Sequence, residues 1–185
     1  KLGELMEVIH RHDVIVQDHK FDNFESAWVI PTEERRPGVI LYLHGGGYTC
    51  GDLDYAKGFA STLAAECAVR VFCSAYRLAP ETCFPGAVDD AEESYRYLLS
   101  KGYTPQQIML CGESAGGGLI YALCLRLKEK SLPLPNGIIA ISPWVDLTLS
   151  GESYETNREN DPSLTEELLR FYAECYAGDE TNPEV

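Results

Sequence analysis

The pattern of apolar and polar positions divides the chain into an N-terminal hairpin and a longer region in which strands and helices alternate. Residues 13–19 and 24–30 are apolar or alternating on either side of Asp22-Asn23, which predicts an antiparallel hairpin. Continuous apolar runs predict buried strands at 39–43, 69–74, 108–111 and 137–141. Helical patterns occupy 55–67, 87–99 and 115–130. This order predicts an α/β fold, with a mostly parallel sheet and helices on both of its faces.

The alternation of strands and helices stops after Asp146. Residues 150–161 are polar and typical of turns, and a helix is predicted over 163–176. Ser163 is the expected N-cap of that helix, with Glu166 completing a capping box. Because no further strand follows before Val185, we expect a single domain, 1–185, whose sheet is incomplete at its C-terminal side.

The composition excludes several classes of partner. A length of 185 residues with 45% hydrophobic content suits one domain with a substantial core. The formal net charge of -14 argues against nucleic acid and against an anionic membrane surface, because both require a basic face. Neither a signal peptide nor a membrane-spanning run is recognisable, so we expect no membrane association.

The seven cysteines form no C-x-x-C pair and have no histidine at the spacing of a zinc site. Several lie in apolar runs, where a thiol behaves as a small hydrophobe. An odd number of cysteines in such positions favours a reducing compartment. The sequence therefore predicts a cytoplasmic protein with no metal and no organic cofactor.

The strongest chemical signal is the G-x-S-x-G motif at 112–116, which lies directly between a predicted strand and a predicted helix. In this context the motif is a nucleophile elbow, a sharp turn that presents Ser114 at the carboxyl end of the sheet. A glycine-rich turn without catalytic function is the simpler alternative. A phosphate-binding loop is disfavoured because the motif has no lysine.

A second glycine motif, His44-Gly45-Gly46-Gly47, follows the buried strand at 39–43. Acyl transfer places negative charge on the carbonyl oxygen, and backbone amides commonly stabilise it. We expect the amides of Gly45, Gly46 and Ala115 to form this oxyanion hole. His44 and Gly47 are expected to support the loop, with His44 acting through a hydrogen bond and not as a base.

These motifs together resemble the hormone-sensitive lipase family of carboxylesterases. The resemblance rests on His44–Tyr48, Tyr76–Glu81, Gly112–Gly118 and Ser142–Leu147. It implies an α/β-hydrolase fold and an ester hydrolase, with a small-molecule ester as substrate and short acyl chains favoured. It also implies a two-part lid, of which 1–12 is a remnant of the first part and 150–178 the second. An ion pair between Arg77 and Glu81 is expected to brace the oxyanion loop.

A serine nucleophile requires a histidine that an acid orients, in the chain order serine, acid, histidine. All four histidines of this sequence precede Ser114. Asp146, Asp161 and Asp179 follow it, but they are expected in a motif, a helix cap and the tail. We therefore assign neither acid nor histidine to this chain.

Three explanations of the missing histidine remain. The sequence is either part of a longer esterase, one piece of a split protein that needs a complementary C-terminal fragment, or a truncated protein without turnover. A receptor-like protein that binds a ligand on the same scaffold, without hydrolysing it, is the alternative function.

Overall fold

The structure is a computed structural model that describes residues 13–178. The predicted lid remnant at 1–12 and the tail residue Asp179 lie outside this range. Six strands form one sheet in the order β1-β2-β4-β3-β5-β6. Their bounds are β1 Val14–Lys20, β2 Glu25–Pro31, β3 Val39–Leu43, β4 Arg70–Ala75, β5 Ile108–Glu113 and β6 Gly137–Ile141.

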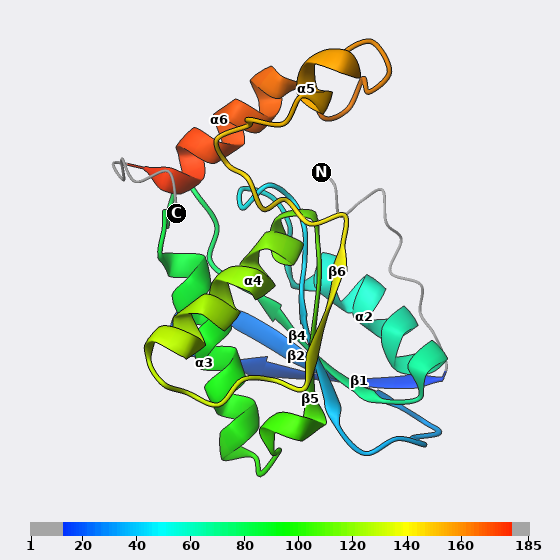
Figure 1. Ribbon diagram of the computed structural model, residues 1–185. Helices are drawn as coiled ribbons and strands as arrows, with labels where there is room; N and C mark the ends of the chain where they lie inside the picture. Colours follow the sequence, from blue (N-terminus) through cyan, green and yellow to red (C-terminus); the bar gives the residue numbers. More distant parts are fainter. Residues whose placement is uncertain (1–12, 179–185) are drawn as a thin grey trace.

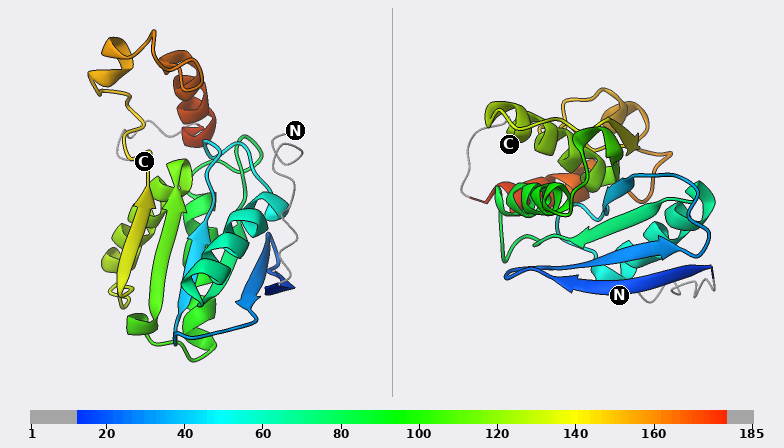
Figure 2. Two further views of the ribbon diagram at one scale, coloured as in Figure 1. Left: turned by 90° about the vertical axis from the view of Figure 1, so that its right-hand side faces the viewer. Right: turned by 90° about the horizontal axis from the view of Figure 1, so that it is seen from below.

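The predicted hairpin and the mostly parallel sheet are both confirmed. β1 pairs with β2 and β2 pairs with β4 in antiparallel register. β4, β3, β5 and β6 are parallel to one another. The left view of Figure 2 shows β1 and β6 at the two edges of this twisted sheet.

Helices cover both faces of the sheet, as the alternation predicted. Their bounds are α2 Leu53–Cys67, α3 Gly86–Ser100, η1 Pro105–Gln107, α4 Ser114–Glu129, α5 Ser153–Thr156 and α6 Glu166–Ala177. α2 lies on one face, and α3 and α4 lie on the other (Figure 1). All five residues of β3 are buried, since Leu41 packs in the core on the α3 and α4 side and Tyr42 packs on the α2 side. A strand enclosed in this way needs an unbroken apolar run.

The segment that carries α5 and α6 stands over the carboxyl ends of the parallel strands (Figures 1 and 2). The N-cap of α6 lies two residues later than predicted, because Thr165 and not Ser163 caps the helix and accepts from the amide of Leu168 at 3.2 Å. The carboxylate of Asp161 instead accepts from the amides of Ser163 and Leu164. The predicted capping box is therefore wrong, and the Glu166 carboxylate pairs with Arg170 at 2.6 Å.

The cysteines of the structure are all free thiols. Cys73 and Cys111 are buried in central strands, as expected, and burial raises their pKa values to about 12 and about 11. In residues 13–178 no helix has the length and apolar character needed to cross a bilayer.

Candidate active site

Ser114 lies at the junction between β5 and α4, in the backbone conformation that a nucleophile elbow requires. Its φ of +51° is in the left-handed region, which a non-glycine residue rarely adopts. The flanking glycines allow the close approach: a Cβ on Gly112 would lie 2.2 Å from the carbonyl oxygen of Gly116, and one on Gly116 would lie 2.1 Å from that of Leu43. The predicted sharp turn between strand and helix is therefore present.

The second glycine motif forms a tight turn beside Ser114. The amides of Thr49 and Cys50 both donate to the carbonyl oxygen of Gly46, at 3.1 and 2.9 Å. Gly46 has a φ of +117°, and a Cβ there would lie only 2.2 Å from the carbonyl oxygen of Cys50. Within residues 13–178, the amides of Gly46 and Gly47 meet no acceptor. Neither amide is therefore satisfied by this part of the protein.

The amide of Gly45 differs from the other two because it already has a partner. It donates to the carboxylate of Glu113 at 3.4 Å. The sequence predicted that this amide faces an oxyanion, whereas the structure directs it to the carboxylate next to Ser114. Gly45 still lies against the elbow, since a Cβ at this position would be 3.2 Å from that of Ser114.

His44 is fully buried beneath the glycine loop. Its Nδ1 donates to the carbonyl oxygen of Gly45 at 2.7 Å, and its ring stacks on Tyr76 with centroids 4.5 Å apart. Burial lowers the pKa of His44, so the ring is neutral near pH 7. A neutral, enclosed imidazole that bonds the loop backbone is placed to hold the loop.

Glu113 and Tyr55 form a contact that the motifs did not predict. The hydroxyl of Tyr55, in the first turn of α2, donates to the Glu113 carboxylate at 2.6 Å. Burial and this hydrogen bond both raise the pKa of Tyr55, so the phenol remains a donor. Glu113 thus joins the elbow to the glycine loop and to α2. A charged residue at the end of a buried strand was the available signal.

The turn at 76–81 braces the loop, but through different groups from those expected. The Tyr76 hydroxyl donates to the carbonyl oxygen of His44 at 2.7 Å, and the amide of Ala79 donates to that of Tyr48 at 2.9 Å. Arg77 does not pair with Glu81. Its partner is Asp90 in α3, at 2.7 Å, and the Asp90 side chain is only 1% exposed. The predicted pair is wrong because the helix brings a buried carboxylate closer than the turn does.

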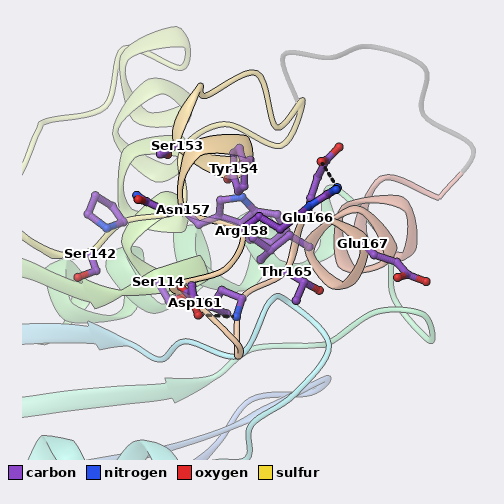
Figure 3. A pocket seen from close by; sticks show the side chains of 14 residues that line it. Ser114, Ser142, Ser153, Tyr154, Asn157, Arg158, Asp161, Thr165, Glu166 and Glu167 are labelled. Carbon is purple, nitrogen blue, oxygen red and sulfur yellow. Dashed lines mark hydrogen bonds and ion pairs between the residues drawn. The ribbon is translucent and has the colours of Figure 1, made fainter.

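Two cavities meet at Ser114. The first, of about 580 Å³, is bounded by the glycine loop and by apolar side chains that include Trp144, Leu168 and Tyr172. The second, of about 640 Å³, is lined mainly by polar side chains of the segment that carries α5 and α6. Figure 3 shows those side chains around Ser114, among them Asn157 and Arg158. The serine therefore faces one apolar compartment and one of mixed polar and apolar character.

α6 packs on the glycine loop and on residues 83–84, which lie just before α3. Tyr176 stacks on Tyr48 with centroids 3.9 Å apart and planes 11° from parallel. Its carbonyl oxygen accepts from the amide of Phe84 at 2.7 Å. A Cβ on Gly47 would lie 2.6 Å from the Tyr172 ring, so this glycine is needed for close contact with the helix. The C-terminal half of α6 is thus part of the site's wall.

The parallel sheet, the serine elbow and the adjacent glycine loop together define an α/β hydrolase. A family model described as alpha/beta hydrolase fold matches residues 40–184, and the chain belongs to this family. The resemblance to hormone-sensitive lipases is confirmed by a crystal structure of an esterase from the bacterial hormone-sensitive lipase family. That structure matches with a TM-score of 0.91 and 37% identity, over 100% of this chain and 61% of the other.

Curated relatives carry esterase names. An acetyl-hydrolase of Streptomyces hygroscopicus is 39% identical over 152 residues, which are 82% of this chain and 50% of the relative. An esterase of Acinetobacter venetianus is 36% identical over 145 residues, or 78% of this chain and 48% of the relative. The chain thus spans about half the length of the curated relatives that it matches.

Proposed function

We propose that the complete protein is a serine carboxylesterase in which Ser114 attacks the ester carbonyl of a small-molecule substrate. The observation that carries the proposal is the left-handed backbone of Ser114, at the entrance of two cavities and beside a loop with free amides. An acyl-enzyme forms as the alcohol leaves, and water then releases the acid. The names of the relatives support the same reaction class.

For the oxyanion hole we propose the amides of Gly46, Gly47 and Ala115. Gly45 is the less suitable donor because its amide points to Glu113. Ala115 lies in the first turn of α4, where amides have no partner within the helix and where the helix dipole favours negative charge. Gly47, predicted only to support the loop, thus takes the place that the sequence suggested for Gly45.

The proposed reaction needs a base that residues 115–185 do not contain, since no histidine follows Ser114. His44 is fully buried and bonded to the loop, which makes it unsuitable for proton transfer. We propose that the histidine and its acid belong to sequence outside these 185 residues. The relatives, about twice as long as the matched region, are consistent with this proposal.

We further propose that the segment 150–178 is a lid and that the two compartments divide the substrate. The apolar cavity of about 580 Å³ suits the acyl chain, which Trp144 and Tyr172 would confine to a short length. The second cavity, of about 640 Å³, suits an alcohol portion that carries hydrogen-bonding groups, because Asn157 and Arg158 are among the residues that line it.

The test uses the complete protein, p-nitrophenyl acetate and p-nitrophenyl butyrate. We expect turnover that Ser114→Ala abolishes, and labelling of Ser114 by a fluorophosphonate probe. Parental turnover in Ser114→Ala would refute the mechanism. Absence of both turnover and labelling would favour the receptor-like alternative.

A second measurement uses residues 1–185 alone, for which we expect no turnover. Steady hydrolysis by this segment would show that the base lies within it. The intact mass of the purified natural protein distinguishes one long chain from a split protein with a complementary fragment.

A further inference from the structure

A third cavity, of about 590 Å³, lies far from Ser114. It is bounded by β1, β2, the first residue of β4, the end of α3 and Gln107 of η1. Gln107 directly precedes β5, whereas Ser114 directly follows it. Six strand residues separate them, which corresponds to about 20 Å at the usual rise of a strand. The cavity therefore lies at the opposite end of the sheet from the proposed active site.

Aromatic rings form the walls of this cavity. His19 stacks on Tyr97 with centroids 4.3 Å apart, and Trp28 lies 28° from parallel with Tyr103 at 6.1 Å. The indole of Trp28 donates to the hydroxyl oxygen of Tyr97 at 3.3 Å. Burial and the charge of Lys101 lower the pKa of His19, so this wall is neutral near pH 7. The four rings contact one another, and all of them line the cavity.

One cation in the cavity has no acidic partner among residues 13–178. The Lys101 ammonium lies 5.0 Å above the centre of the Tyr97 ring, in cation–π geometry. By contrast, Arg70 pairs with Glu34 at 2.8 Å. Asp18 also lines the cavity, but its carboxylate is 2.7 Å from Lys57 of α2. Because α2 packs on the other face of the sheet, the negative charge of Asp18 is directed away from the cavity.

The position of Lys101 at the C-terminal end of α3 is explained in part by the helix dipole, which favours a cation there. The dipole does not explain why the ammonium overhangs a cavity with four aromatic walls. Because the protein has a net charge of -14, an unpaired cation over an aromatic ring is a distinctive feature of this cavity. Aromatic rings and polar side chains, with one unpaired cation among them, suit a planar ring that carries one negative charge.

We propose that this cavity is a second ligand site, separate from the esterase site, and that it takes a small aromatic carboxylate. The ring of the ligand packs against the edges of the Trp28 and Tyr103 rings. Its carboxylate pairs with the ammonium of Lys101, and the side-chain amides of Gln17 and Gln107 line the same space. The site does not depend on Ser114, so it exists whether or not the protein is an esterase.

The test titrates the complete protein with 2-naphthoate and records amide and indole NMR shifts. We expect shifts at the Trp28 indole, Gly102 and Tyr103, and none from neutral 2-naphthamide at the same concentration. Lys101→Met should raise Kd about fivefold, the effect of losing a partly exposed ion pair. Lys128→Met, an equal change of net charge at an exposed position on α4, should leave Kd unchanged.

Three outcomes would overturn the proposal. Shifts confined to Gly46, Gly47 and Ala115 would place the ligand at the esterase site. Equal binding of the amide would remove the role of the carboxylate. Equal Kd values for Lys101→Met and Lys128→Met would show that ligand binding responds only to the net charge of the protein.

Discussion

Gly46→Ala is the sharpest test of the proposed oxyanion hole. The substitution adds one methyl group and removes no polar atom, so its effects come from backbone geometry. The new Cβ would lie 2.2 Å from the carbonyl oxygen of Cys50 and 3.3 Å from the Cys50 Cβ. Real Cβ atoms do not approach backbone so closely, and the turn closed by the amides of Thr49 and Cys50 must therefore open.

The expected magnitude follows from the geometry. A side chain at the φ of +117° costs about 1–3 kcal/mol of folding free energy. Opening the turn also displaces the free amide, and loss of one oxyanion donor lowers kcat by about 10²- to 10³-fold. Because this interaction acts in the transition state, we expect KM to change much less than kcat.

The assay is steady-state hydrolysis of p-nitrophenyl butyrate by the complete protein, together with urea unfolding. Gly58→Ala is the matched control, since Gly58 lies within α2 and a Cβ there meets nothing within 4 Å. This control should retain its kcat and gain up to about 1 kcal/mol of stability. A Gly46→Ala variant that folds and keeps the parental kcat would refute the proposed role of the loop.

Three further predictions concern the contacts around the site. Tyr55→Phe removes the 2.6 Å hydrogen bond to Glu113 and should lower the free energy of unfolding, measured in urea, by about 1–2 kcal/mol. The same substitution should also lower kcat. Asp90→Asn should lower the free energy of unfolding by about 2 kcal/mol, because it leaves Arg77 without its buried partner. Glu81→Gln should leave the free energy of unfolding unchanged. The reverse result would support the Arg77–Glu81 pair predicted from sequence. Hydrogen bonds from Thr148 and Ser150 lower the pKa of Asp146 to about 2. Its contribution to stability is therefore present above pH 4 and lost as the pH falls toward 2, and Asp146→Asn should remove that part of the acid dependence in thermal unfolding.

Strand positions were largely predictable because each buried strand has a local signature. β3 and β6 coincide with their predicted runs, and β4 and β5 differ by at most two residues at an end. Enclosure between helices demands consecutive apolar residues, which any reader of the sequence can recognise. The start of α6 was harder, because Ser163 and Thr165 are both good caps. The Asp161 carboxylate resolves the choice by taking the Ser163 and Leu164 amides outside the helix.

Side-chain partners across the fold were much less predictable. Arg77 and Glu81 are neighbours in sequence, and the pairing of near neighbours is a natural first expectation. Asp90 lies thirteen residues from Arg77, and only the packing of α3 against the sheet brings its carboxylate to 2.7 Å. In the same way, α6 and the glycine loop are more than one hundred residues apart in sequence, and no local pattern predicts their contact.

The glycine motifs account for the two halves of the site separately, but their relative position depends on a residue that neither motif specifies by type. Glu113 occupies the variable second position of G-x-S-x-G, yet its carboxylate contacts the loop at Gly45 and α2 at Tyr55. A short apolar residue there would preserve the elbow and leave the loop amide and the phenol without an acceptor. An unsatisfied buried donor costs about 1–3 kcal/mol, so the loop would shift to find water or another acceptor. The spacing between Ser114 and the proposed oxyanion donors therefore depends on this three-way contact, and Tyr55→Phe tests it without changing either motif.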